Sequence, residues 1–194
     1  MSQDLKYFMH DMLNVKHDQS IQIIGKLNPT DLAQMHSYFP ECEAIGWDFT
    51  ERLQNVGVSK AAGIDEVVFA HEEFLSFNVD EDCSAFENFL NEHYPRLADV
   101  SSTYMFCDAS YAQMHDDSNL ESRGQLMFIA SNPSNHTFVS VDVDGVTHEV
   151  IPEAGDILFL DIACRHALFP KQVDVNDLAS IQPMKMAMVS INGF

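Results

Sequence analysis

The residues whose types and spacing most clearly indicate chemistry are a histidine and an aspartate two positions apart, His115 and Asp117. They stand at the end of residues 111–117, a run whose pattern predicts a β-strand. Residues i and i+2 of a strand project from the same face, so this imidazole and this carboxylate can bind one ion while Asp116 points away. The pair therefore predicts two ligands of a metal site.

A third ligand must come from elsewhere in the chain, and His166 is the best candidate. It follows a Gly155-Asp156 turn and an apolar run, which we expect to form a strand that delivers the imidazole. Two imidazoles and one carboxylate form the facial triad that suits Fe(II) and leaves coordination positions open. Those positions could hold a co-substrate and dioxygen together.

The other histidines have less distinctive settings. His136 and His148 flank a predicted hairpin and could share a metal only if both faced inward, so we expect packing or surface roles for them. The remaining five lie in or beside predicted helices, with no second ligand at metal spacing: His10, His17, His36, His71 and His93.

With its motifs in this order, the chain resembles the Fe(II)/2-oxoglutarate-dependent dioxygenase superfamily, most nearly its prolyl-hydroxylase-like branch. The resemblance covers residues 101–194. It rests on three features, namely the motif His115-Asp-Asp117, the segment 152–170 with its Gly-Asp strand and distal His166, and the late segment Lys185-Met-Ala-Met-Val-Ser-Ile.

The resemblance implies a double-stranded β-helix in which His115, Asp117 and His166 are the metal ligands and the catalytic residues. Fe(II) would chelate 2-oxoglutarate, and reaction with O₂ would give succinate, CO₂ and an oxidant that removes hydrogen from a C–H bond. Family members that halogenate lack the carboxylate ligand. The presence of Asp117 therefore favours hydroxylation.

The distal carboxylate of 2-oxoglutarate must meet a fixed cation, because burying an unpaired carboxylate costs several kcal/mol. Lys185 matches the basic position of the family. Family members often carry Arg there, with Ser or Thr two residues later, whereas this chain has Ala187. Residues 171–183 also resemble an inserted loop. Three other basic residues stay open as rivals for this role: Lys171, Arg165 and Arg123.

Strand alternation adds further candidates around the metal. Tyr111 and Gln113 are predicted to share a face with His115 and to hydrogen-bond the co-substrate or substrate. Tyr104 is an alternative, because the family commonly places a Tyr on the preceding strand. Asp161 could orient the third ligand or occupy an exposed strand position.

The elements that must position these residues are strands in the C-terminal half. Asp144-Gly145 is a favoured two-residue turn, and it predicts a hairpin of 136–143 with 146–151. Short strands joined by turns suggest a jelly roll or double-stranded β-helix, in a mainly β protein with N-terminal helices. The other predicted strands are 103–107, 111–117, 125–131, 156–163 and 184–191.

The N-terminal half is predicted to be mostly helical. Residues 5–13 carry an apolar stripe at helical spacing, and a second helix is expected over 30–38 with Thr30 as N-cap. Ser84 and Glu87 form a capping box that predicts a third helix, closed or kinked by Pro95. We expect a single domain over 1–194, with a helical buttress over 1–100 and a jelly-roll core over 101–194.

Composition narrows the classes of partner. The 194 residues include 30 Asp plus Glu against 10 Lys plus Arg, which gives a net charge of −20 and excludes a basic footprint for nucleic acid or an anionic membrane. No apolar run approaches the length of a membrane span, and the N-terminus lacks the pattern of a signal peptide. Four cysteines without close spacing, Cys42, Cys83, Cys107 and Cys164, predict free thiols in the cytoplasm. A small-molecule or peptide substrate is the expected partner, and the oligomeric state stays open.

Two other functions stay open. A cupin-like metalloenzyme that does not use 2-oxoglutarate would have no buried cation opposite the metal, so a solvent-facing Lys185 with no other base inside the barrel would favour it. A non-enzymatic jelly-roll binding module would leave His115, Asp117 and His166 too far apart to share an ion.

Overall fold

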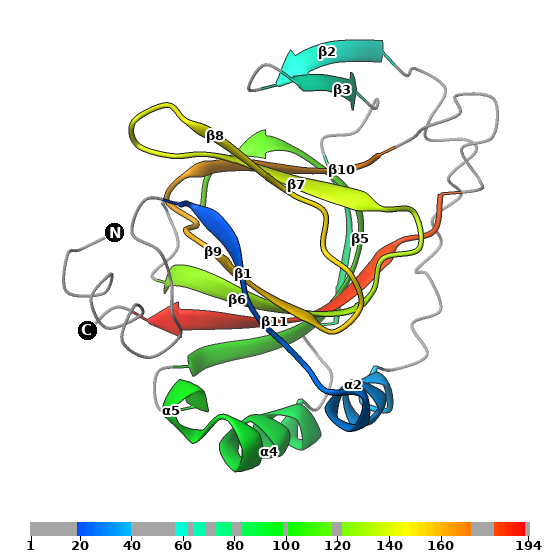
Figure 1. Ribbon diagram of the computed structural model, residues 1–194, viewed down its shortest axis with the longest axis vertical. Helices are drawn as coiled ribbons and strands as arrows, with labels where there is room; N and C mark the ends of the chain where they lie inside the picture. The colour runs from blue at the N-terminus through cyan, green and yellow to red at the C-terminus, as the bar shows by residue number, and fades with distance from the viewer. Residues whose placement is uncertain are drawn as a thin grey trace.

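A long antiparallel sheet dominates the computed structural model and curls on itself (Figure 1). The structure describes residues 19–39, 57–61, 64–68, 73–78, 83–98, 101–117, 122–171 and 181–192. The strands follow the order β1-β9-β6-β11-β5-β10-β7-β8, and β4 pairs with β5 outside this path. They are β1 (Ile21–Lys26), β4 (Glu73–Asn78), β5 (Ser101–His115), β6 (Ser122–Ser131), β7 (His136–Val141), β8 (Thr147–Val150), β9 (Asp156–Leu160), β10 (Arg165–Pro170) and β11 (Met184–Asn192).

The side chains of the sheet divide into an inward face and an outward face. On β11, Met184, Met186 and Met188 belong to the cluster inside the curl, whereas Ala187 and Val189 belong to the cluster on the outside. This division follows the period of two residues along a strand. The inward face is the surface on which a site at the mouth of the barrel can be built.

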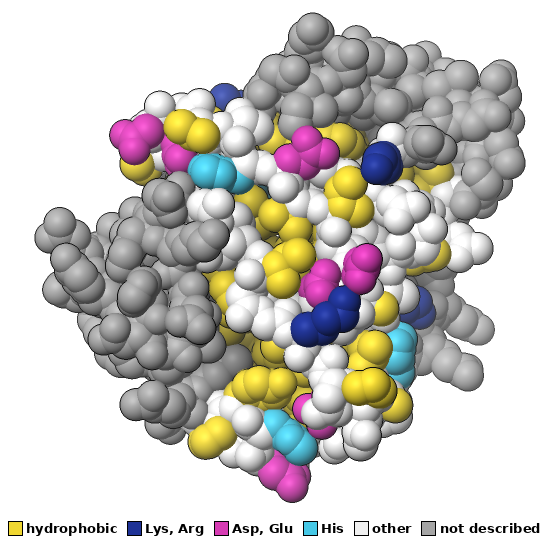
Figure 2. Space-filling model, viewed as in Figure 1, with side chains coloured by type: hydrophobic (Ala, Val, Ile, Leu, Met, Phe, Trp, Pro, Cys, Tyr) yellow, Lys and Arg dark blue, Asp and Glu magenta, His cyan; other side chains and the backbone are white. Residues whose placement is uncertain are grey.

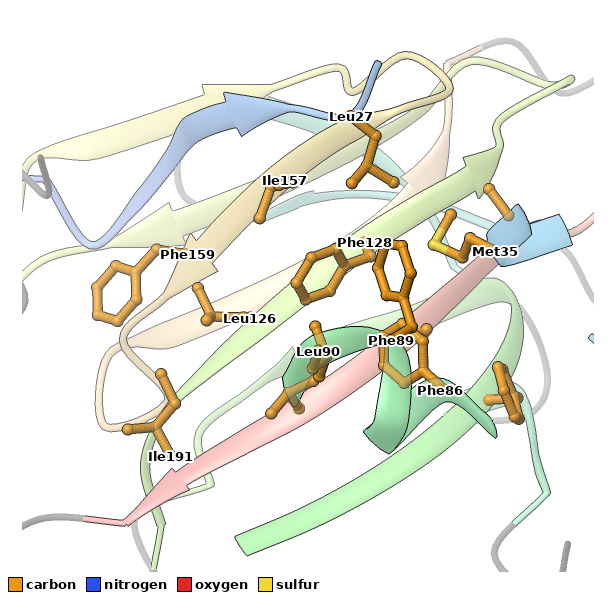
Figure 3. Packing of buried hydrophobic residues seen from close by; sticks show 14 residues of the cluster. Leu27, Met35, Phe86, Phe89, Leu90, Leu126, Phe128, Ile157, Phe159 and Ile191 are labelled. Carbon is orange, nitrogen blue, oxygen red and sulfur yellow. The ribbon is translucent and has the colours of Figure 1, made fainter. Parts of the chain in front are cut away.

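Helices cover the outward face. These are α2 (Pro29–His36), α4 (Ser84–His93) and the short α5 (Pro95–Ala98), which lie below the sheet in Figure 1. Phe86 and Phe89 of α4 are each 1% exposed, and the Phe86 ring meets that of Phe128 on β6 edge to face, with centroids 5.6 Å apart (Figure 3). The aromatic-rich helix predicted from the sequence therefore supports the sheet from behind.

Strand β5 carries two irregularities that decide which residues face inward. Ala109 and Ala112 both belong to the inward cluster although they are three residues apart, and the pairing with β4 shifts register between them. A second shift separates Ala112 from His115 in the pairing with β10. Each shift marks one extra residue on β5, a β-bulge. Beyond a bulge, the positions whose side chains face inward change from odd to even along the strand or the reverse.

The fold class predicted from the sequence, mainly β with helices, is confirmed as an antiparallel jelly-roll barrel. The mostly helical assignment of residues 1–100 is wrong for the part that the structure describes. This region supplies β1 and β4 to the barrel and a separate two-stranded sheet of β2 (Gly57–Ala61) and β3 (Ile64–Val68). The helix predicted over 5–13 lies outside the described residues.

Several local predictions need correction. Helix α2 begins at Pro29 with Asn28 as N-cap, because the Asn28 side chain accepts hydrogen bonds from the backbone of Thr30 and Asp31. Ser84 is the first residue of α4 rather than its cap, so the predicted capping box is wrong. Pro95 does separate α4 from α5, as predicted.

The hairpin of β7 and β8 is confirmed, but its loop spans residues 142–146 rather than two residues. The carboxylate of Asp142 accepts hydrogen bonds from the backbone N–H groups of Asp144 and Val146, which stabilises the longer turn. Gly145 takes a positive φ of 80° there.

Two further findings concern the predicted environment. No helix in the described part of the chain is long and apolar enough to cross a membrane. Cys107 and Cys164 are buried and Cys83 is partly buried, whereas Cys42 lies outside the described residues.

Candidate metal centre

Three side chains meet where β5 ends and β10 begins. His115, the last residue of β5, pairs with His166 of β10, and their ring centroids are 4.4 Å apart. Asp117 places one carboxylate oxygen 3.8 Å from His115 Nε2 and the other 3.6 Å from His166 Nε2. One ligand atom from each residue lies within 4.8 Å of the others. The structure thus brings together the three residues that the sequence predicts as metal ligands.

Backbone carbonyl groups hold two of the three ligands in place. The N–H of Asp117 donates to the carbonyl of Ile162 over 2.9 Å, which fixes the residue after the end of β5. His166 Nδ1 lies 2.9 Å from the carbonyl oxygen of Cys164. A carbonyl can only accept, so Nδ1 carries the proton and the lone pair on Nε2 is directed at the site. Sequence reasoning missed these contacts because backbone groups leave no side-chain signal.

The turn before β9 explains how His166 reaches this place. Gly155 adopts a φ of 89°, a conformation that favours glycine, and its N–H donates to the Ile129 carbonyl on β6. Strand β9 then pairs with β1 and β6, and the turn at 161–164 reverses the chain into β10. The predicted Gly-Asp turn and the strand that follows it are therefore confirmed.

The electrostatics of the cluster favour a bound cation. The imidazole of His166 beside Asp117 lowers the pKa of that carboxyl below its usual value, while partial burial opposes the shift. His166 is buried, but the side chains of His115 and Asp117 are 28% and 27% exposed, so the cluster is accessible from one side. Two neutral imidazoles and a charged carboxylate fit Fe(II) and leave coordination positions for other ligands.

Lys185 does not lie on the inward face with these ligands. It stands between Met184 and Met186, both of which belong to the inward cluster, so alternation directs its side chain outward beside Ala187. The expectation that Lys185 faces a co-substrate inside the barrel is therefore corrected by the structure. The physical reason is the register of β11, which presents methionines to the interior.

The other basic side chains that the structure describes also lie outside the barrel. Arg165 and Lys171 are exposed. The Nζ of Lys26 lies 3.0 Å from Glu153 and 3.2 Å from Asp156, and basic and acidic side chains adjoin on the face in Figure 2. None of the four Lys and Arg side chains that the structure describes thus faces inward, whereas those of Lys60, Arg96 and Arg123 are not among the described side chains.

The two predicted tyrosine neighbours are not brought to the metal cluster. Tyr111 directly precedes the inward-facing Ala112, so it points to the opposite face, and the bulge before His115 is the reason that simple alternation failed. The side chain of Gln113 lies outside the described residues. Tyr104 packs with the helices instead, its ring centroid 6.3 Å from that of Phe86, and burial raises the pKa of its hydroxyl.

Asp161 does not orient His166; it stabilises the turn between β9 and β10. Its carboxylate accepts a hydrogen bond from the Ala163 N–H, and its own N–H donates to the Ser20 carbonyl. The inward face instead holds two buried polar side chains that sequence reasoning did not select, Ser140 and His136 of β7. Each of them stands two residues from the apolar Phe138 on a predicted strand. Strand alternation therefore predicts that they share the face of Phe138.

Known structures share this architecture. No family model matches the chain, and no curated protein matches its sequence. An oxidoreductase of the 2OG-Fe(II) oxygenase family from Burkholderia pseudomallei superposes with a TM-score of 0.56 and 12% identity, covering 95% of this chain and 90% of its own. A prolyl-4-hydroxylase from Pseudomonas putida gives a TM-score of 0.53 and 13% identity, covering 96% of this chain and 100% of its own.

A third structure, HygX from Streptomyces hygroscopicus with nickel and 2-oxoglutarate bound, gives a TM-score of 0.50 and 10% identity over 99% of this chain and 87% of its own. At these identities the comparison concerns the fold. The resemblance predicted from the sequence is confirmed at that level: the chain has the fold of the Fe(II)/2-oxoglutarate-dependent oxygenases.

Proposed function

We propose that this protein is an Fe(II)- and 2-oxoglutarate-dependent dioxygenase that hydroxylates a small molecule or a peptidyl side chain, such as prolyl. The observation that carries the proposal is the convergence of His115, Asp117 and His166, whose ligand atoms lie within 4.8 Å of one another. The fold shared with 2-oxoglutarate oxygenases supports it.

Each of the three residues has a distinct task in this proposal. His166 offers Nε2 as a ligand because its Nδ1–H is held by the Cys164 carbonyl. Asp117 supplies a negative charge that offsets part of the charge of the cation, and its lowered pKa keeps it deprotonated at neutral pH. Bound there, Fe(II) with 2-oxoglutarate and O₂ would supply the oxidising chemistry. The partly exposed side of His115 and Asp117 gives a substrate its route of approach.

The test is consumption of 2-oxoglutarate by the purified full-length protein in air with added Fe(II). Slow formation of succinate and CO₂ is expected even without the natural substrate, and it should be lost in His115→Ala. The His36→Ala variant is the matched control, because His36 is exposed on α2. Metal-loaded protein that leaves 2-oxoglutarate unchanged under these conditions would contradict the proposal.

One observation favours a second candidate, a cupin-like metalloenzyme that does not use 2-oxoglutarate. Lys185 faces outward, and no other Lys or Arg side chain that the structure describes faces inward. This candidate predicts tight metal binding with no binding of 2-oxoglutarate. The non-enzymatic module required the three ligands to lie apart, a condition that their separation does not meet.

The environment and partner belong to the same proposal. Four cysteines without the close spacing of a metal or redox motif favour a reducing, cytoplasmic location. The net charge of −20 favours a basic or neutral substrate over a nucleic acid or an anionic membrane, because it attracts cations from a distance.

A further inference from the structure

We infer that His136 on β7, rather than a lysine or arginine, receives the distal carboxylate of the co-substrate. This inference rests on the proposed function. A dicarboxylate buried in the barrel needs a positively charged partner, and Lys185 faces outward. His136 takes this role instead.

The position of His136 is the first argument. It is 0% exposed and shares the inward face of β7 with Phe138 and Ser140. Ser140 pairs directly with the metal-ligand candidate His166, and His136 pairs with Pro170 farther along β10. The inward face of β7 therefore runs from the metal cluster to His136, over about 13 Å between the Cα atoms of residues 140 and 136. A diacid held by the metal would bind in an extended form along this line.

The hydrogen bonds of Asn132 fix the orientation of the His136 ring. The Asn132 amide nitrogen donates to the carbonyl groups of His136 and Pro152, and its oxygen accepts from the His136 backbone N–H. That oxygen also lies 3.1 Å from His136 Nδ1. Because the oxygen can only accept, Nδ1 carries a proton, and Nε2 lies on the far side of the ring from Asn132. A second proton on Nε2 would make the ring a cation able to donate to a carboxylate, a form that the carboxylate itself favours.

A second observation comes from Ser140. Its Oγ is fully buried and has no hydrogen-bond partner in the described part of the chain. Such a hydroxyl is costly unless a ligand or water satisfies it. Lying beside His166, it is placed to hydrogen-bond a ligand that extends from the metal toward His136.

Other inward groups are less suited to the role. His148 also pairs onto the inward face, opposite Ser140, but its Nε2 lies 2.9 Å from the carboxylate of Asp142. Lys185 faces outward, away from the barrel interior. His136 is thus the best candidate among the described residues outside the metal cluster. It faces inward, its ring can become cationic, and its Nδ1 contacts a neutral amide rather than a carboxylate.

The test compares two ligands of the Ni(II)-loaded, full-length protein by calorimetry: 2-oxoglutarate and 2-oxopentanoate, which has a methyl group in place of the distal carboxylate. His136→Gln should weaken binding of 2-oxoglutarate by about ten- to a hundredfold, the range for a charged hydrogen bond, and leave 2-oxopentanoate and Ni(II) binding unchanged. Lys185→Met is the matched control and should bind both ligands like the wild type. The inference is overturned if Lys185→Met loses the preference for 2-oxoglutarate or if His136→Gln retains it.

Two further results separate the possible failures. If the wild type binds Ni(II) but neither oxoacid, the proposed function itself fails and the inference fails with it. If His136→Gln does not fold, ¹⁵N-histidine NMR of the wild-type Zn(II) form replaces it. Both ring nitrogens of His136 should be protonated with 2-oxoglutarate but not with 2-oxopentanoate, and an unchanged ring would overturn the inference.

Discussion

At the scale of single residues, the metal cluster depends on three side chains that touch one another. His115→Ala or His166→Ala should weaken binding of Fe(II) or Ni(II) by more than about 100-fold, because loss of a direct ligand costs more than loss of an outer partner. The fold should stay intact, with an unchanged circular dichroism spectrum. Calorimetry under anaerobic conditions measures the affinity.

Asp116 and Asp117 provide a matched pair for the same measurement. They are adjacent aspartates, but only Asp117 belongs to the cluster, and Asp116 is exposed. Asp117→Ala should lose metal binding and Asp116→Ala should keep it. Equal effects of the two substitutions would mean that general negative charge, rather than the cluster, attracts the ion.

Residue-level prediction succeeded where only the local spacing mattered. His115 and Asp117 are two residues apart, and both join His166 in a cluster that could hold a metal ion, although Asp117 lies just beyond the end of β5. It failed where a bulge or a strand register decided the outcome. Tyr111 faces away because β5 contains extra residues, and Lys185 faces away because β11 turns its methionines inward. These features depend on how neighbouring strands pair, which a single segment of sequence does not contain.

At the scale of elements, helix α4 supports the sheet that carries the site. Phe86 is 1% exposed and packs against Phe106 and Phe128 of the outward face. Phe86→Ala should reduce the free energy of unfolding by about 3–5 kcal/mol, the usual cost of a large cavity in a core. Urea denaturation measures it, with the 82% exposed Val143→Ala as a control that should change stability by less than about 0.5 kcal/mol. An equally small effect of Phe86→Ala would contradict this packing.

The loop between β7 and β8 gives a pH-dependent prediction. The hydrogen bond with His148, followed by those from the Val146 and Asp144 N–H groups, lowers the pKa of Asp142. A lowered folded-state pKa adds stability above the unfolded value of about 3.9, and this stability is lost as the pH falls through the folded-state pKa.

Asp142→Asn removes this charge while keeping the acceptor oxygen. The wild type should melt at a higher temperature than the variant near pH 5.5, and the difference should shrink as the pH falls below about 3.9. Thermal denaturation between pH 5.5 and pH 3 measures the difference. A difference that grows toward pH 3 would contradict the role given to the Asp142 carboxylate.

The elements themselves were only partly predictable. The C-terminal strands follow from β-branched and aromatic runs between turns, and most of them form as predicted. Strand β1 was missed because Ile21–Lys26 is short and finds its partner, β9, more than 130 residues later. The helix predicted from the capping box forms, but it begins one residue earlier than expected, at Ser84 with Cys83 as N-cap. The Ser-x-x-Glu pattern alone does not determine the residue at which a helix begins.

At the scale of the whole molecule, the barrel brings together residues from distant strands. The pairing order β5-β10-β7 places His115 beside His166 and His166 beside Ser140, so one face of three strands carries the ligand candidates and the polar line to His136. The net charge of −20 is spread over a chain whose described basic side chains all lie outside the barrel. The few Lys and Arg side chains that the structure describes therefore supply no positive charge to the barrel interior.

The central claim is that this cluster binds Fe(II) together with 2-oxoglutarate. The most direct measurement is an anaerobic optical titration of the full-length protein with Fe(II) and then 2-oxoglutarate. Bidentate chelation should produce a weak visible charge-transfer band in the wild type that saturates with 2-oxoglutarate and is absent in Asp117→Ala. A wild-type protein that has bound Fe(II) and shows no such band would contradict the account.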